Sequence, residues 1–172
     1  MLHVALFNEQ KRQDLLLDMW KYVENLRPDW TLKIVGDGYM RPKLESKMKA
    51  LQLKHVEFLG YQSPHPYYDE AAIFCLTSAF ESFGLVLVEA MAYGCVPMAF
   101  NSFETVTDSI DDGKNCFLIQ PFEDKQYAKQ VIKLIDDIQL RKRMADLSIE
   151  KSKELQTNKI MPRWIEIIKE LN

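Results

Sequence analysis

Short apolar runs alternate with longer amphipathic stretches along the first 120 residues of the chain. Six of these runs are four or five residues long and are bounded by turn residues, which is the pattern of buried strands. We predict strands at residues 3–6, 31–35, 56–59, 73–76, 96–100 and 116–119.

The stretches between these runs have the spacing of helices. In residues 13–26, apolar side chains recur at helical intervals from Leu16 through Trp20 to Leu26, and Pro28 prevents the helix from continuing. Further helices are predicted at residues 41–52, 66–72, about 85–93, 125–138, 140–155 and 158–171. Strands that alternate with helices imply a parallel sheet covered on both faces. We therefore predict one doubly wound α/β domain of about six strands over residues 1–172, with its ligand crevice at the carboxyl ends of the strands.

The final predicted helix has an apolar stripe. Ile160, Trp164, Ile165, Ile168 and Leu171 share one face of residues 158–171. A stripe of this kind normally packs on a core. We expect it to pack on the core of this domain, and the alternative is that it packs on a second domain absent from the chain.

Composition and charge exclude several classes of protein. The chain is 47% apolar with a formal net charge of −3, which argues against a broad nucleic-acid interface. No apolar run reaches the roughly 18 residues that a membrane span requires. Cys75, Cys95 and Cys116 are expected to be buried free thiols, which indicates a reducing, cytoplasmic location. The histidines share no ligand spacing with these cysteines, so we expect no zinc site.

Candidate chemistry is concentrated where the fourth predicted strand passes through a polar turn into a helix. This stretch, residues 76–92, reads LTSAFESFGLVLVEAMA and holds two carboxylates, Glu81 and Glu89. Ser82, Phe83 and Gly84 precede the helix, whose first turn offers unpaired amides to an anion. Because its neighbours are apolar, Glu89 is expected to be buried and to need a donor or a ligand.

The two glutamates belong to a longer pattern. ESFGLVLVE is continued by AMAYGCVPM, and the segments VGDG at 35–38, FLGY at 58–61 and DGKN at 112–115 occur in the same order as in a known family. The chain resembles the group 1 glycosyltransferases, which are retaining enzymes of the GT-B architecture. The resemblance covers nearly the whole chain. It implies a C-terminal domain that binds a nucleotide sugar, whose N-terminal acceptor domain is absent from the chain.

The resemblance also implies roles for individual residues. Glu81, which would address hydroxyls of the transferred sugar, and Lys11, which would neutralise the leaving diphosphate, are the expected catalytic residues. Glu89 would bind the ribose diol. The remaining expected donor-binding residues are Ser82, Phe83, Gly84, Leu85, Gly36, Gly38, Tyr61, Gln62 and Arg12. For Gly36 and Gly38 a simple tight turn is an equal alternative, and for Tyr61 the alternative is packing at a rim.

One position departs from the family pattern. The family normally places an arginine for the diphosphate where this chain has Leu6, in VALFNEQK. Leucine has no donor, and losing one preorganised donor typically costs about 10²- to 10³-fold in rate. Either Arg12 or Arg41 reaches the phosphates instead, or the site is weakened.

Three functions remain open from the sequence. The first is a transferase half that needs an N-terminal domain for metal-independent transfer, without a cofactor, to a glycan or lipid-linked acceptor. Such a role fits polysaccharide biosynthesis and peripheral membrane association of the full enzyme. The second is a non-catalytic module that binds a nucleotide or sugar. The third is a sugar-nucleotide epimerase, a class that shares the GT-B fold.

Overall fold

A computed structural model describes residues 1–170 and has a single six-stranded sheet. The strands are β1 (Leu2–Val4), β2 (Leu32–Val35), β3 (Val56–Gly60), β4 (Ile73–Leu76), β5 (Val96–Phe100) and β6 (Phe117–Ile119). All neighbouring pairs are parallel, and the strand order is β3-β2-β1-β4-β5-β6. This is the doubly wound order of dinucleotide-binding folds, so the predicted fold class is confirmed.

Helices connect the strands, as the amphipathic stretches predict. They are the 3₁₀ turn η1 (Glu9–Lys11) and the helices α1 (Gln13–Leu26), α2 (Arg41–Ala50), α3 (His65–Glu70), α4 (Leu85–Ala92), α5 (Val106–Ser109), α6 (Asp124–Asp136), α7 (Ile138–Glu154) and α8 (Thr157–Glu170). The predicted boundaries of the longer helices agree within two residues. The short elements η1 and α5 were not predicted, since one turn is too short to show an apolar period.

The first strand ends two residues earlier than expected. The backbone continues alongside β2 through bonds from the Ala5 amide to the Val35 carbonyl (3.1 Å) and from the Phe7 amide to the Asp37 carbonyl (2.8 Å). The neighbouring strand β2 ends here, because Gly36, with φ of +132°, leaves the extended conformation. The ladder therefore becomes irregular at residue 36, and Leu6 lies in the loop that follows β1.

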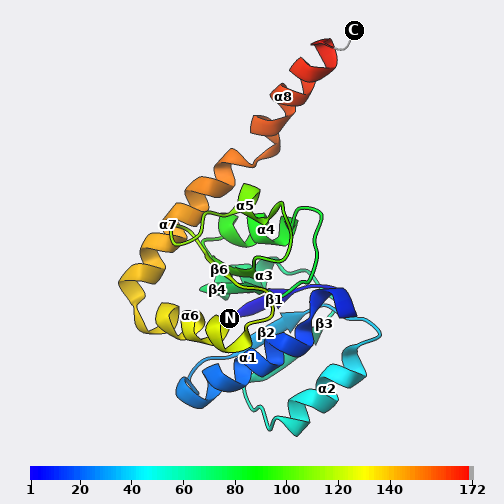
Figure 1. Cartoon of the computed structure of the whole chain (residues 1–172), viewed down its shortest axis with the longest axis vertical. Coiled ribbons are helices and arrows are strands. Elements are labelled where there is room, and N and C mark those ends of the chain that lie inside the picture. The colour runs from blue at the N-terminus through cyan, green and yellow to red at the C-terminus, as the bar shows by residue number, and fades with distance from the viewer. Residues whose placement is uncertain (171–172) are drawn as a thin grey trace.

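Two apolar clusters cover the two faces of the sheet. On one face α1, α2 and α6 pack through a cluster that includes Trp20, Leu44 and Val131. On the other face α3 and α4 pack through a cluster that includes Tyr68 and Leu87. Figure 1 shows α1, α2 and α6 on the side of the sheet opposite to α4 and α5.

The three cysteines lie in these clusters. Cys75, Cys95 and Cys116 are free and buried, as predicted. Burial raises the pKa of both Cys75 and Cys95 to about 12. The thiols are therefore protonated near neutral pH, which fits small apolar side chains in the core rather than reactive groups.

The DGKN segment forms a structural turn before β6. The Asp112 carboxylate accepts a hydrogen bond from the Leu118 amide (2.9 Å), and the buried Asn115 side chain accepts one from the Asp111 amide (2.8 Å). The Asn115 carbonyl also accepts a bond from Ser148 of α7 (2.8 Å). This segment therefore closes the loop between α5 and β6 and anchors it to α7.

The last two helices lie outside the layered body. Helix α7 runs along its edge and contacts both α4 and α6, whereas α8 extends away from the sheet (Figure 1). No described residue of α8 is buried, and Trp164, Ile165 and Ile168 are exposed. The expectation that this stripe packs on the domain's own core is therefore wrong. Leu171 lies outside the described residues.

Within residues 1–170, no helix combines the length and the apolar character needed to cross a membrane.

Candidate functional site

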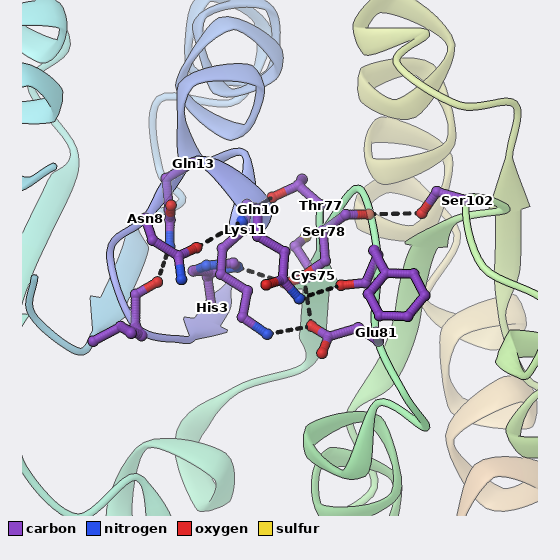
Figure 2. Close-up of polar contacts among 12 residues, drawn as sticks. His3, Asn8, Gln10, Lys11, Gln13, Cys75, Thr77, Ser78, Glu81 and Ser102 are labelled. Carbon is purple, nitrogen blue, oxygen red and sulfur yellow. Dashed lines mark hydrogen bonds and ion pairs between the residues drawn. The ribbon is translucent and has the colours of Figure 1, made fainter.

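The site lies where the strand order reverses, between β1 and β4. The loops that leave these neighbouring strands are connected to opposite sides of the sheet, so their backbones diverge and leave room for a ligand at the carboxyl ends. The loop after β1 holds Lys11, and the loop after β4 holds Glu81. Figure 2 shows both side chains at this edge, pointing toward each other.

Lys11 and Glu81 form an ion pair that is mostly shielded from solvent. The Lys11 Nζ lies 2.6 Å from the Glu81 Oε1, and the two side chains are 19% and 12% exposed. The same oxygen accepts a hydrogen bond from the Ser78 hydroxyl (2.7 Å). The two predicted catalytic residues are therefore brought into direct contact, although they are 70 positions apart.

A set of hydrogen bonds fixes the loops that hold this pair. The Thr77 hydroxyl donates to the Lys11 carbonyl (2.9 Å), and the Ala79 amide donates to the Gln10 carbonyl (2.7 Å). The Gln10 side chain in turn donates to the Phe80 carbonyl (2.7 Å; Figure 2). These bonds join η1 to the loop after β4. They fix the backbone next to Lys11 and the backbone next to Glu81.

The first turn of α4 presents backbone amides without protein acceptors. Gly84 precedes the helix with φ of +71° and provides no capping side chain. Among the described residues, the amides of Phe83, Gly84 and Leu85 have no hydrogen-bond acceptor, and the Leu85 side chain is 65% exposed. An uncapped helix N-terminus of this kind attracts an anion. Ser82 lies in the same turn, exposed.

Glu89 is exposed, so the prediction that it is buried is wrong. The buried face of α4 is formed by Leu87, Ala90 and Met91. At about 100° per residue, Glu89 lies about 200° around the helix from Leu87, on the opposite side. The apolar neighbours in the sequence therefore did not indicate which face of the helix Glu89 occupies.

Glu89 nevertheless has a partner. The Tyr68 hydroxyl of α3 donates a hydrogen bond to the Glu89 Oε2 (3.1 Å). Burial, and after it the nearby Glu89 carboxylate, raise the pKa of Tyr68 well above its ordinary value. The Tyr68 ring also stacks on Tyr93, with ring centroids 5.4 Å apart. One carboxylate oxygen of Glu89 is thus oriented from within the domain, and the side chain faces solvent.

Gly36 and Gly38 allow the loop after β1 to approach β2 closely. A Cβ on Gly36 would lie 1.9 Å from the Ala5 carbonyl oxygen, and one on Gly38 would lie 2.4 Å from the Phe7 carbonyl oxygen. The two residues have φ of +132° and +155°. The backbone itself therefore requires glycine at these positions, and Gly36 also lines a cavity.

That cavity has a volume of about 490 Å³ and a mostly apolar lining. It is lined by the predicted base-contact residues Tyr61 and Gln62, together with Leu6, Gly36 and Val86. Tyr61 is 92% exposed, and the Gln62 side chain donates to the Leu59 carbonyl (2.8 Å). Leu6 is 59% exposed. We call this space the apolar cavity.

The two arginines considered as substitutes at the phosphates already have partners. Arg12 has φ of +50°, pairs with Asp14 (3.1 Å) and lies over the ring of Phe122. Arg41 pairs with Asp37 (3.0 Å) and with Glu45 (2.8 Å). Within residues 1–170, neither arginine side chain forms a hydrogen bond or an ion pair with Lys11 or Glu81.

Six of the predicted site residues line three separate cavities. Glu81 and Ser82 line a cavity of about 700 Å³ between the loops that follow β4 and β5, which we call the polar cavity because six of its eight lining residues have polar side chains. Gly36, Tyr61 and Gln62 line the apolar cavity, and Glu89 lines a third, of about 470 Å³, beside the junction of α7 and α8. Within residues 1–170 no group of three His, Cys, Asp or Glu side chains could hold a metal ion.

Several contributors were missed at the level of sequence. Ser78 precedes Glu81 by three residues, a spacing that could have suggested the contact. Gln10 and Tyr68 reach the site from other elements, and no local pattern indicates them. Asn101 and Glu104 line the polar cavity from the loop after β5, which the sequence interpretation left without a role.

Comparison with known proteins identifies the family. The family model for glycosyl transferases group 1 matches residues 1–151. An uncharacterized glycosyltransferase of Haemophilus influenzae is 33% identical over 153 residues, which cover 88% of this chain and 43% of that protein. The chain thus spans less than half the length of this relative.

Two solved structures share the fold. HepE of Anabaena, in complex with UDP and glucose, superposes with a TM-score of 0.90 at 25% identity, over 98% of this chain and 47% of that one. The C-terminal domain of LpcC, a group 1 family glycosyl transferase of Francisella tularensis, superposes with a TM-score of 0.80 at 25% identity, over 88% of this chain and 83% of that one. With the family match over residues 1–151, these likenesses establish that the chain belongs to the glycosyl transferases of group 1.

Proposed function

We propose that the chain is the donor-binding half of a retaining glycosyltransferase that transfers a sugar from a nucleoside diphosphate sugar without a metal. The observation that carries this proposal is the ion pair between Lys11 and Glu81 (2.6 Å), placed at the switch point of the sheet beside the unpaired amides of α4. A cation, amides and a carboxylate suit the phosphates and hydroxyls of such a donor.

Each group has a part in the proposed reaction. The ammonium group of Lys11 and the amides of Phe83 to Leu85 stabilise the negative charge that develops on the leaving diphosphate. Glu81 accepts hydrogen bonds from hydroxyls of the transferred sugar, and in doing so it shares Lys11 with the phosphates. Glu89, oriented by Tyr68, binds the vicinal hydroxyls of the ribose.

The apolar cavity suits another part of the donor. The apolar cavity, with Tyr61 at its edge, fits a nucleobase.

We propose a cytoplasmic enzyme that acts on a glycan or lipid-linked acceptor in polysaccharide biosynthesis, with peripheral membrane association. The acceptor would be bound by a second domain, N-terminal to this one.

Titration calorimetry of the whole chain with UDP, UDP-glucose and GDP-mannose tests donor binding. We expect Glu89→Gln to weaken the binding of the preferred nucleotide about tenfold, because it loses charge-assisted bonds to the ribose. Glu123→Gln, an exposed change beside α6, is the matched control and should bind like the wild type. A folded chain that binds none of these nucleotides would refute the proposal.

A non-catalytic binding module is the second candidate, and Leu6 favours it. This side chain is exposed, so nothing in the core requires leucine there. Leu6→Arg should therefore fold normally and bind nucleoside diphosphates more tightly, by about tenfold for one charge-assisted contact. When the chain is joined to an N-terminal half, the module hypothesis predicts turnover only with Arg at position 6, and equal turnover with Leu6 would exclude it.

A further inference from the structure

The polar cavity is lined by residues 80–82 and 101–105 and lies next to Glu81 of the ion pair. Its volume of about 700 Å³ lies within the range of small-molecule sites, roughly 300–1,000 Å³. Its walls are the loops that follow β4 and β5, two neighbouring parallel strands. Glu81, one member of the ion pair, lies in the wall formed by the loop after β4. The opposite wall, from the loop after β5, has no role in the function proposed above.

Two hydrogen bonds hold these walls together. The Thr105 hydroxyl donates to the Ser82 carbonyl (2.9 Å), and the Ser102 hydroxyl donates to the Ser78 carbonyl (2.6 Å). Figure 2 shows the second of these bonds joining the two loops. The cavity is therefore formed before any ligand arrives, which reduces the entropic cost of binding.

The wall from the loop after β5 has two polar side chains without partners. Within the described residues, neither the Asn101 side-chain amide nor the Glu104 carboxylate has a hydrogen-bond or ion-pair partner, and both residues are exposed. The Asn101 backbone is fixed, since its amide donates to the Ile119 carbonyl (2.8 Å). An amide that donates and accepts, beside carboxylates that accept, matches vicinal hydroxyl groups.

The other wall has an exposed aromatic ring on a fixed backbone. The Phe80 side chain is 59% exposed and lines the cavity. Its carbonyl accepts a bond from the Gln10 side chain, and the preceding Ala79 amide donates to the Gln10 carbonyl. Phe80 and Phe103 form the apolar part of the lining, and the exposed Phe80 ring offers a flat surface to the C–H face of a sugar ring.

We propose that the polar cavity is a pyranose-binding subsite. Phe80 packs against one face of the ring, and Asn101 and Glu104 bind its hydroxyls opposite Glu81. The inference rests on the proposed function, because Glu81 is shared with the donor site. The pyranose comes either from the donor or from the end of an acceptor glycan, and the loop after β5 would then set the preference for one sugar over another.

Calorimetry on Asn101→Ala and Glu104→Gln tests the subsite, with Glu123→Gln as the matched control. The ligands are UDP and GDP alone, UDP-glucose, UDP-galactose, UDP-N-acetylglucosamine, GDP-mannose, and methyl glucoside or maltose added with saturating UDP. If the pyranose is the donor's, both variants lose about tenfold in affinity for the nucleotide sugar and keep their affinity for the nucleotide. If it is the acceptor's, only binding of the free glycoside falls.

Either of these results supports the subsite. The proposal is overturned if both variants bind all ligands like the control, or if they lose the nucleotide and the nucleotide sugar equally. If the wild type binds free glycosides but no nucleotide, the donor function fails and the subsite survives. If it binds none of the ligands at millimolar concentration, both proposals fail. Thermal melts of the variants, whose changes are on exposed side chains, confirm that they are folded.

Discussion

At the scale of the residue, the buried His3 makes the stability of the core depend on pH. Its ring is fully buried in β1, and the Nδ1 lies 2.8 Å from the Cys75 carbonyl oxygen. A carbonyl accepts, so Nδ1 holds the proton, and the buried Nε2 has no partner within residues 1–170. Burial lowers the pKa of His3 from 6.5 to about 4.

This pKa shift predicts a loss of stability in weak acid. The unfolded chain takes up a proton on His3 below pH 6.5, whereas the folded chain does so only near pH 4. The contribution of His3 is therefore complete above pH 6.5 and is lost as the pH falls toward 4. Between about pH 7 and pH 5 the loss should be about 2 kcal/mol.

Urea unfolding of the wild type and of His3→Gln at the two pH values measures this contribution. Glutamine keeps a donor for the Cys75 carbonyl and does not titrate, so the difference between the two proteins isolates His3. We expect the free energy of unfolding of the wild type to fall by about 2 kcal/mol more than that of the variant. Equal changes in the two proteins would contradict the assignment.

The same scale shows what a sequence can and cannot indicate about this site. Lys11 and Glu81 were predicted as catalytic residues from the resemblance to the group 1 glycosyltransferases, and the parallel strands that precede them bring the two side chains to one edge. The burial of Glu89 was predicted wrongly. Apolar neighbours in the sequence show that the helix is apolar on average, but they do not show on which face of the helix a single residue lies. Gln10 and Tyr68 could not be predicted, because their contacts depend on three-dimensional packing between distant segments.

At the scale of the element, α4 depends on the glycine that precedes it. Gly84 has φ of +71°, and a Cβ there would lie 3.3 Å from Leu87 and 3.4 Å from Phe103. Gly113 has nearly the same φ, +73°, but a Cβ there would meet no atom within 4 Å. The two glycines therefore have the same φ within 2° and differ in their surroundings.

This pair predicts the effect of alanine at each position. Both Gly84→Ala and Gly113→Ala should lower the free energy of unfolding by about 1–2 kcal/mol, because each places an L-residue in the left-handed region. Only Gly84→Ala should weaken nucleotide binding, by about tenfold, since it displaces the amides at the start of α4. Urea unfolding and calorimetry with UDP measure the two effects. Equal binding by both variants would show that these amides do not contact the ligand.

At the scale of the whole molecule, the sequence predicted the layers but not the place of the last helix. The alternation of strands and helices determines a doubly wound sheet almost by itself, because each apolar run must be covered on both faces. The stripe on α8 has the same helical period as the buried face of α1. Periodicity shows that a helix has an apolar face, but it does not show what covers that face.

The exposed stripe leads to a prediction about the isolated chain. Helix α8 has 14 residues, none of them buried, and Pro162 in its interior removes one backbone hydrogen bond. Isolated helices of this length are marginal in water. Removal of residues 157–172 should therefore change the free energy of unfolding by less than about 0.5 kcal/mol, and the amides of α8 should exchange rapidly with deuterium.

Association of the chain is the complementary measurement. Because Met161, Trp164 and Ile165 are exposed together on α8, the whole chain should self-associate at high concentration, and the chain ending at Gln156 should remain monomeric in sedimentation. When the chain is joined to an N-terminal half, we propose that this exposed face of α8 packs on that half, so rapid exchange in α8 should be lost there. Rapid exchange that persisted in the joined enzyme would show that α8 packs on neither half.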